Sequence, residues 1–454
     1  MTKESNREGF SSKLGAILAL AGSAVGLGNI WRFPYMVSEY GGAAFIVVYI
    51  LCIAIVALPI MLCEFSVGRR SRASAFNAVA VLGGGKHWNW IGYLVVFIPF
   101  ITLCYYSVIG GWTLEYFFGS CMFRLESTHS PNEIGDFFEH FVSNPWKPVI
   151  THAVFLFITT AIIMLGVQKG IEKSSKIMMP QLFVIMLAIA VWVAFLPGAS
   201  DGLKFIFKPE FGKITPQVTL AAMGQAFYTL SIGSGILITY ASYFKRDDSL
   251  IKTAGSTIIA DLVFAIIAAC AIIPALFPYG METSQGTGLV FKALPVTFSR
   301  MPAGNIVSAI FFFGVLLAAI TSEMALFEVP VSFLMDHKGY SRKKACHIVF
   351  IIGLIIGSIC SLSFGPLSFI TIGDKNIFDI TDYTIGNILL PFSGLAIVLF
   401  VGWKMKHSDL YEEINNGGEN VEASRKISFR ILYFTIRYIS PAAIIAIFLS
   451  GIFQ

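Results

Sequence analysis

The chain has 454 residues, of which 56% are hydrophobic and only 13% are charged, and its formal net charge is +5. A soluble globular protein carries about 25% charged residues, so roughly half of the usual charge is missing. This composition excludes an ordinary cytosolic enzyme, a disordered chain and a nucleic-acid-binding protein, and it indicates an integral membrane protein.

Residues 1–13 carry three basic side chains and no small-residue cleavage site, so we expect a cytoplasmic N-terminal segment and not a signal peptide. The rest of the chain is dominated by long apolar stretches. Because a hydrocarbon core of about 30 Å needs about 20 apolar residues, each stretch predicts one membrane-spanning helix. The eleven predicted spans are 14–37, 42–67, 90–118, 148–168, 177–197, 217–243, 253–277, 302–335, 346–364, 383–403 and 429–453.

The lysines and arginines predict the orientation of these spans. With the N-terminus in the cytoplasm, 23 of the 32 basic residues fall in cytoplasmic segments and 8 in external loops, while Arg32 lies inside the first span. This distribution fits the positive-inside rule. We therefore expect a multi-pass protein of the cell membrane with a cytoplasmic N-terminus and an extracellular C-terminus, and we interpret the basic residues as topology determinants and not as a nucleic-acid or lipid site.

The first and sixth spans contain residues that a simple lipid-facing helix avoids. The first reads AGSAVGLGNIWRFP from Ala21 to Pro34, and the sixth reads TLSIGSG from Thr229 to Gly235. Glycine costs about 1 kcal/mol relative to alanine inside a helix, so both clusters favour local unwinding. Close packing of small residues between helices is the alternative reading of either cluster alone.

Two interrupted spans in corresponding positions of two halves are typical of inverted-repeat transporters. We therefore predict an all-α membrane fold of eleven transmembrane helices, with a 5+5 inverted repeat and discontinuous helices 1 and 6. The predicted units are a first repeat at 14–197, an extracellular linker at 198–216, a second repeat at 217–403, a cytoplasmic linker at 404–428 and an eleventh helix at 429–454.

Several ionisable residues lie within the predicted spans, where each is a candidate functional residue. They are Arg32, Glu64, Glu115, Asp261, Glu323, Glu328 and Asp382. Together with the hydroxyls of Thr321 and Ser322, the carboxylate of Asp261 belongs to a hard-oxygen set that suits an alkali cation. Glu323 could be a proton carrier or a satisfied interhelical contact, and the second reading is also preferred for Glu115 and Glu328. The chain has no HExxH, GxSxG or P-loop motif, so we do not expect an enzyme.

Five motifs together resemble the neurotransmitter:sodium symporter family in its prokaryotic amino-acid transporter branch, which has the leucine-transporter fold. They are AGSAVGLGNIWRFP at 21–34, EYGGAAF at 39–45, GQAFYTLSIGSG at 224–235, AAITS at 318–322 and FDITDY at 378–383. The resemblance extends from Arg7 to about residue 440. It implies sodium-coupled symport of a neutral L-amino acid into the cell by alternating access.

The resemblance also implies two sodium sites and one substrate site. The first sodium site would use Ala24, Asn29, Thr229 and Asp261, and the second Gly22, Val25, Ala318, Thr321 and Ser322. The implied substrate-binding residues are Ala24, Leu27, Gly28, Thr102, Tyr106, Tyr228, Thr229, Ser231, Ser234, Ser322 and Leu326.

Two positions of the motifs bear on the substrate. Relatives that carry biogenic amines have an aspartate where this chain has Gly26, so an amino acid fits better than an amine. Ser234 stands where a bulky residue is common, which favours a large hydrophobic or aromatic side chain. The serines of the site leave a polar substrate open as the alternative.

Chloride-dependent relatives bind the anion at positions equivalent to Tyr49, Gln225, Thr229, Asp261 and Ala265. Asp261 supplies a fixed carboxylate there, and two negative charges a few ångströms apart repel strongly in a low dielectric. We therefore expect that chloride is not required.

The resemblance implies gates on both sides of the site. Arg32 with Asp382 would close the outer side, and Arg7 with Asp336, near Tyr243, would close the inner side. Gly170 and Pro180 reproduce a Gly-x9-Pro spacing that relatives use to unwind helix 5. We expect a monomer or weak dimer in the lipid bilayer. The rival functions are a sodium-dependent amino-acid sensor on the same fold and, less favoured, an intramembrane enzyme.

Overall fold

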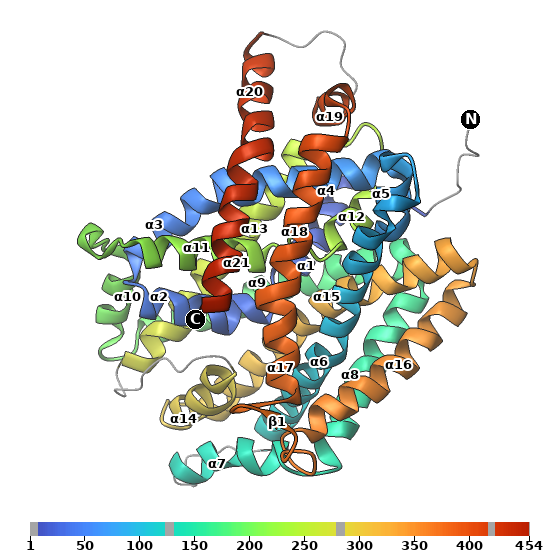
Figure 1. The fold of residues 1–454 in the computed structure, drawn as a ribbon. Helices are drawn as coiled ribbons and strands as arrows, with labels where there is room; N and C mark the ends of the chain where they lie inside the picture. Colours follow the sequence, from blue (N-terminus) through green and yellow to red (C-terminus); the bar gives the residue numbers. More distant parts are fainter. Residues whose placement is uncertain (1–7, 123–130, 278–286, 416–422, 454) are drawn as a thin grey trace.

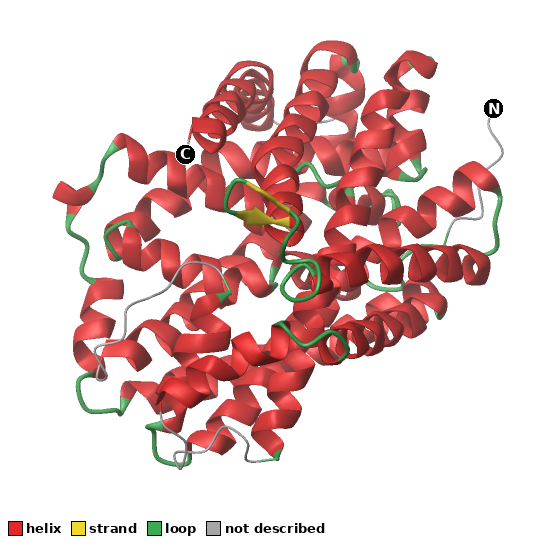
Figure 2. Ribbon diagram, turned by 60° about the horizontal axis from the view of Figure 1, so that its bottom comes forward, coloured by secondary structure: helices red, strands yellow, loops and turns green. Residues whose placement is uncertain are grey.

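The computed structural model describes residues 8–122, 131–277, 287–415 and 423–453. These residues are almost entirely helical. Within them the β structure is one antiparallel hairpin, in which β1 (Thr371–Ile372) pairs with β2 (Lys375–Asn376) (Figure 2).

The first half of the chain alternates α-helices with short π-helical and 3-10 segments, both of which are labelled η. Its elements are α1 (Lys13–Ala24), η1 (Gly28–Arg32), α2 (Phe33–Glu39), α3 (Ala43–Cys52), η2 (Ile53–Ala57), α4 (Leu58–Ser71), α5 (Ala75–Gly83), η3 (Lys86–Trp88), α6 (Asn89–Cys121), α7 (Pro131–Val142), α8 (Lys147–Met164), η4 (Val167–Glu172), α9 (Lys173–Ala194), α10 (Ala199–Phe207) and η5 (Phe211–Lys213).

The second half follows the same pattern. Its helical elements are α11 (Pro216–Thr229), α12 (Ile236–Ala241), α13 (Leu250–Leu276), η7 (Leu289–Ala293), α14 (Leu294–Ser299), α15 (Gly304–Lys338), α16 (Arg342–Leu362), α17 (Ile377–Tyr383), η8 (Thr384–Leu389), α18 (Leu390–Leu399), η9 (Phe400–Lys404), α19 (His407–Ile414), α20 (Ala423–Phe434), η10 (Thr435–Ile439) and α21 (Ser440–Phe453).

Among the described residues, nine helices are long and apolar enough to cross a membrane, and the bent pair formed by α1 and η1–α2 raises this number to ten. The predicted span at 217–243 is divided into α11 and α12, each of which is too short to cross alone. This helical content fits a multi-pass membrane protein.

The prediction for the fifth span was wrong at its start. The structure has continuous helix from Val167 to Ala194, ten residues earlier than the predicted start at residue 177. The apolar criterion failed because Lys169, Glu172 and Lys173 interrupt the pattern. The carboxyl group of Glu172 is nevertheless buried, since it bonds to the N-terminal segment of the chain.

The core is built around α15, which packs against α6, α9, α1 and α8. In its most apolar stretch, 89% of the residues of α15 are buried, which fits a helix that is hydrophobic on all sides. The short α1 lies near the centre of the molecule and contacts α13, α15 and α9 (Figure 1). The two central helices α1 and α15 therefore meet where the sequence predicts a cation site.

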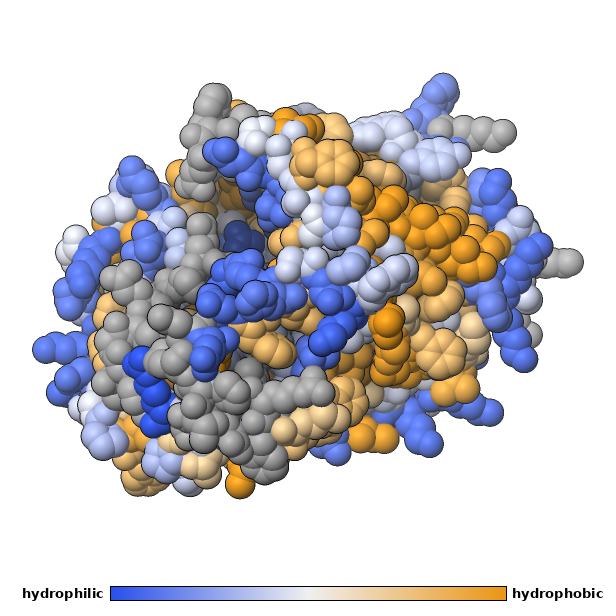
Figure 3. Space-filling view, turned by 90° about the horizontal axis from the view of Figure 1, so that it is seen from below, coloured by the Kyte–Doolittle hydropathy of each residue, from blue (hydrophilic) through white to orange (hydrophobic). Residues whose placement is uncertain are grey.

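The molecule has two distinct ends. The helices α19 and α20 lie at the upper end in Figure 1, whereas α7, α14 and the hairpin lie at the lower end. Seen from below, hydrophilic side chains line the left and right margins, and a hydrophobic area lies to the right of the centre (Figure 3).

Candidate functional site

The first helix breaks at the glycines that the sequence analysis singles out. Helix α1 ends at Ala24, the helix resumes at Gly28, and the axes on either side differ by 57°. The backbone of Val25 leaves the helical region, with ψ of 89°. A break of this kind leaves carbonyl and amide groups without helical partners, and these groups can bind a ligand.

The sixth helix breaks over residues 230–235. Ser231, Gly233 and Gly235 have φ values of 53°, 82° and 73°, in the left-handed region. A Cβ atom at Gly233 would lie 2.6 Å from the carbonyl oxygen of Leu390, so only glycine fits there. Ser231 adopts the left-handed conformation although it carries a side chain. Its hydroxyl donates to the carbonyl of Ser23, in the last turn of α1 just before the other break, at 3.1 Å.

Glu64 of α4 forms a hydrogen bond with the unwound backbone of the second break. Its carboxyl group is fully buried, and its Oε1 accepts a hydrogen bond of 2.7 Å from the amide of Gly233. An acidic side chain from α4 therefore satisfies one of the amide groups that the unwound segment leaves without a helical partner.

A cluster of buried oxygen atoms surrounds Asp261 of α13, on one side of the two breaks. Its Oδ1 accepts from Asn29 Nδ2 at 2.7 Å and from the hydroxyl of Thr229 at 3.0 Å, and its Oδ2 accepts from Tyr49 at 3.4 Å. The side-chain oxygen of Asn29 lies 3.2 Å from the same hydroxyl. The structure thus brings together three predicted ligands of the first sodium site, and Ala24 lines the adjoining cavity.

Gln225 lies one helical turn before Thr229 and is fully buried. Neither its amide nitrogen nor its amide oxygen has a hydrogen-bond partner among the described residues. Tyr49, Thr229 and Asp261, which belong to the same predicted anion-binding set, are instead joined through the carboxylate of Asp261.

A second group of oxygen atoms lies where the end of α1 meets α15. Ser322 Oγ donates to the carbonyl of Gly22 at 3.2 Å, and Thr321 Oγ1 lies 3.1 Å from the carbonyl of Ala318. Positions 318, 321 and 322 share one face of the helix, because they are three and four residues apart. Val25 is fully buried at the end of α1. The predicted members of the second sodium site therefore lie at the end of α1 and on the middle part of α15 that faces it.

A cavity of about 90 Å³ lies between the two breaks. Every predicted substrate-binding residue lines it, namely Ala24, Leu27, Gly28, Thr102, Tyr106, Tyr228, Thr229, Ser231, Ser234, Ser322 and Leu326. The hydroxyl of Tyr106 accepts a hydrogen bond of 3.4 Å from the amide of Leu27.

Sequence reasoning missed four apolar residues in the wall of this cavity. Ile98, Ile236, Ile385 and Leu390 line it together with the predicted residues. Helical spacing could have predicted Ile98, which lies one turn before Thr102. The backbone carbonyl of Ile98 accepts a hydrogen bond of 2.9 Å from the hydroxyl of Thr102. The others carry no local signal, since isoleucine and leucine occur throughout the spans.

The serine hydroxyls around the cavity are already bonded within the protein. Ser231 donates to the carbonyl of Ser23 at 3.1 Å, Ser234 to that of Ser231 at 2.5 Å, and Ser322 to that of Gly22 at 3.2 Å. Each hydroxyl proton is therefore used by a backbone oxygen.

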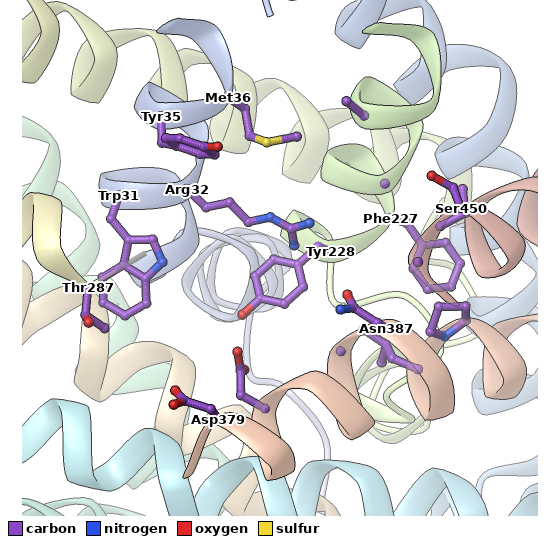
Figure 4. Close-up of a pocket in the computed structure, with 18 of the residues that line it drawn as sticks. Trp31, Arg32, Tyr35, Met36, Phe227, Tyr228, Thr287, Asp379, Asn387 and Ser450 are labelled. Carbon is purple, nitrogen blue, oxygen red and sulfur yellow. The ribbon is translucent and has the colours of Figure 1, made fainter. Parts of the chain in front are cut away.

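A larger cavity of about 580 Å³ adjoins the smaller one, and Tyr105, Tyr106, Tyr228, Gly386 and Leu390 line both. The guanidinium of Arg32 lies 4.4 Å from the centre of the Tyr228 ring (Figure 4). Arg32 and Asp382 both line the cavity but form no ion pair, so the predicted outer gate is not closed by that pair in this structure.

The predicted inner gate lies partly outside the described residues, because Arg7 belongs to residues 1–7. Asp336 accepts a hydrogen bond of 2.7 Å from the amide of Ser74. The hydroxyl of Tyr243 donates to Glu328 Oε1 at 2.6 Å, and Arg342 pairs with the same carboxyl group. Glu328 is thus an interhelical polar contact, as expected from its position in the sequence.

Gly170 and Pro180 both lie within continuous helix, in η4 and α9 respectively. Glu323 follows the second oxygen group directly and is fully buried, and neither of its carboxyl oxygens has a hydrogen-bond partner among the described residues. The preferred reading of Glu323 as a satisfied interhelical contact is therefore wrong for the part of the chain that the structure describes.

Comparison with known proteins gives matches over nearly the whole chain. The profile of the sodium:neurotransmitter symporter family matches residues 7–149 and 143–454. An uncharacterized sodium-dependent transporter of Bacillus subtilis (strain 168), YhdH, is 35% identical, with 97% of both chains aligned. An uncharacterized sodium-dependent transporter of Haemophilus influenzae is 33% identical over the full length of both chains.

The structure is also similar to a solved one. The crystal structure of MhsT in complex with L-phenylalanine superposes with a TM-score of 0.88 at 42% sequence identity, covering 98% of this chain and 100% of that one.

Proposed function

The chain belongs to the sodium:neurotransmitter symporter family, and we propose that it carries a neutral L-amino acid into the cell together with sodium, by alternating access. The observation that carries this proposal is one cavity between two broken helices with a group of hard oxygen atoms on each side of it. Such sites at helix breaks are typical of sodium-coupled transporters.

In the proposed first sodium site, the ion is bound by the carbonyl of Ala24, the side chains of Asn29 and Asp261, and the oxygens of Thr229. The short distances from the hydroxyl oxygen of Thr229 to Asp261 Oδ1 and to Asn29 Oδ1 support this assignment, because one small ion can reach oxygen atoms of all three side chains. The substrate carboxylate would complete the shell.

In the proposed second site, sodium is bound by the carbonyls of Gly22, Val25 and Ala318 and by the hydroxyls of Thr321 and Ser322. The hydrogen bond from Ser322 to the carbonyl of Gly22 supports it, since this bond holds two of the oxygens together across the helix interface.

The amino acid itself would bind in the smaller cavity, with its carboxylate at the first break and its ammonium group between the two breaks. Its carboxylate would accept from the amides of Leu27 and Gly28 and from the hydroxyl of Tyr106, at the start of the helix that continues through α2. A helix N-terminus favours an anion. The ammonium group would face the carbonyls of Ala24, Tyr228 and Thr229 and the hydroxyl of Ser231.

We assign a large hydrophobic or aromatic side chain to the substrate. The serine hydroxyls that could recognise a polar side chain donate to backbone carbonyls, and the remaining wall includes Ile98, Ile236 and Leu326. A polar side chain that needs a hydrogen-bond donor from these serines would have to break one of these bonds. The solved relative MhsT was crystallised with L-phenylalanine, which agrees with this assignment.

The conformation fits an outward-facing state, with the large cavity as the entrance. Arg32 and Asp382 would meet above Tyr106 and Tyr228 when the outer gate closes, and Arg7 with Asp336, near Tyr243, would open on the inner side. The stretch from Gly170 to Pro180 would then unwind and admit water to the second sodium site.

We also propose the arrangement of the helices, the orientation in the membrane, the oligomeric state and the number of bound ions. The eleven helices form two inverted repeats at 14–197 and 217–403, linked by 198–216 and followed by 404–428 and the helix at 429–454. The N-terminus is cytoplasmic, the C-terminus is extracellular, and the protein is a monomer or weak dimer. Two sodium ions bind, and chloride is not required because Asp261 supplies the negative charge.

A binding screen tests the substrate assignment. The purified full-length protein is titrated with each of the twenty amino acids by calorimetry, in sodium and in choline. We expect binding of large apolar and aromatic amino acids in sodium alone. Tight binding restricted to serine, asparagine or glutamine would contradict the assignment.

A further inference from the structure

The segment just before α1 is fastened to the start of the fifth span by Glu172, the last residue of η4. The two carboxyl oxygens of Glu172 accept from the amide of Ser11 at 2.6 Å, from its hydroxyl at 2.6 Å and from the hydroxyl of Ser12 at 2.9 Å. Lys176 Nζ donates a fourth bond, at 2.7 Å. The side chain of Glu172 is only 2% exposed, so its carboxyl group is shielded from solvent.

The neighbourhood is shaped to hold this carboxyl group. A Cβ atom at Gly15 would overlap with the carboxyl group of Glu172, so glycine leaves the room that Glu172 occupies. Ser12 also accepts from the amide of Gly15 at 3.0 Å and caps the first turn of α1. Glu172 is thereby connected to the N-terminus of the helix that carries the site.

Other bonds attach the same segment at the beginning of η4. Glu8 Oε2 accepts from the amide of Val167 at 3.0 Å, and Gln168 Nε2 donates to the carbonyl of Gly9 at 2.8 Å. On its opposite side, the amide of Phe10 donates to the carbonyl of Tyr243 at 3.2 Å. Residues 8–12 therefore bridge η4 and the end of the sixth span.

The part of the fifth span that holds Glu172 is intrinsically weak as a helix. Glycine at position 170 lowers helix propensity, and Pro180 has no amide hydrogen to donate to the carbonyl of Lys176. Hydrogen bonds to a charged group are about twice as strong as neutral ones. The bonds from Ser11 and Ser12 to Glu172 therefore contribute to holding a segment that glycine and proline weaken.

We propose that Glu172 is a positioning residue for transport, which locks the start of α1 to the start of the fifth span. Its bonds to Ser11 and Ser12 must break before α1 can move and before residues 167–180 can unwind. The inference rests on the proposed alternating-access function, because it assigns the lock to the outward-facing state.

Hydrogen–deuterium exchange of the full chain in lipid nanodiscs, with sodium and without amino acid, tests the lock. We compare wild type with Glu172→Gln, which keeps the shape and removes the charge, and with Ser11→Ala, which removes one donor on an exposed residue. The matched control is Glu210→Gln, which breaks an exposed pair with Lys213 at 3.0 Å.

We expect exchange of peptides covering 8–22 and 166–180 to be about tenfold faster in Glu172→Gln, which removes the charge from all four bonds, and about threefold faster in Ser11→Ala, which removes one of them. The double variant should fall short of the product of the two effects, because both act on one contact. The control should match wild type.

Exchange at 166–180 within about twofold of wild type in both single variants would overturn the proposal. If Glu172→Gln unfolds globally, seen as faster exchange in α16 as well, Ser11→Ala alone decides. Because exchange needs no substrate, loss of the proposed transport function in an uptake assay would leave this result intact, and the two failures are distinguishable.

Discussion

Asp261 is a fully buried carboxylate whose hydrogen-bond partners, Asn29, Thr229 and Tyr49, are all neutral. A buried negative charge costs several kcal/mol unless an opposite charge compensates it. A bound sodium ion would supply that charge, so the residue gives the most direct test of the first sodium site.

Replacing Asp261 by Asn should raise the sodium concentration for half-maximal amino-acid binding by about tenfold or more, because one charged ligand is lost. The measurement is scintillation-proximity binding over a range of sodium concentrations. Glu210→Gln, which removes an exposed carboxylate, serves as the control. An unchanged sodium dependence in Asp261→Asn would refute the site.

Ser234 tests the size of the substrate pocket. A phenylalanine there should occupy part of the cavity of about 90 Å³ and weaken binding of aromatic amino acids by about tenfold, while smaller apolar ones still bind. Ser234→Ala keeps the space and removes a hydroxyl that bonds to Ser231, so it should leave selectivity unchanged. Loss of binding in the alanine variant alone would indicate a polar substrate.

The polar residues of the site could be predicted because their chemistry is out of place in a membrane helix. Asn29, Asp261 and Thr321 each interrupt an apolar stretch, and the structure brings each into its predicted group. Ile385 and Leu390 could not be predicted, because nothing local distinguishes them from residues that face lipid.

The proposed function depends on the two helix breaks. Both were predicted from the glycine clusters in the sequence. The beginning of the fifth span was missed, since its buried Glu172 bonds to a segment more than 150 residues away in the sequence. Hydropathy averaged over a window of sequence predicts a loop at such charged residues, although Glu172 is buried in the structure. Long-range bonds of this kind have no local signature.

Gly233 tests the second break. Gly233→Ala would place a side chain at φ of 82° and against the backbone carbonyl of Leu390, which cannot easily move. We expect the unfolding midpoint in detergent to fall by about 2–6 °C, together with weaker binding. The control is Gly255→Ala in α13, where a Cβ has open space and should be neutral or stabilising. Equal midpoints for the two variants would contradict the strained geometry.

At the scale of the whole molecule, two cavities share a wall of aromatic residues, and the larger one is the entrance in the proposed outward-facing state. Residues 8–12 bridge the elements at the other end of α1. Alternating access requires the site to open to one side of the membrane at a time, and a cavity at one end with a bridged segment at the other fits that requirement. Ten of the eleven predicted spans have a counterpart in the described residues as single or bent helices, and the sixth is divided by its own break.

The central claim is tested most directly by uptake of radiolabelled L-phenylalanine into liposomes that contain the purified chain, with an inward sodium gradient. We expect accumulation above the external concentration, its loss when choline replaces sodium, and equal uptake when gluconate replaces chloride. Sodium-dependent binding without accumulation would contradict symport and indicate a sensor, and accumulation that is indifferent to sodium would contradict both assigned sodium sites.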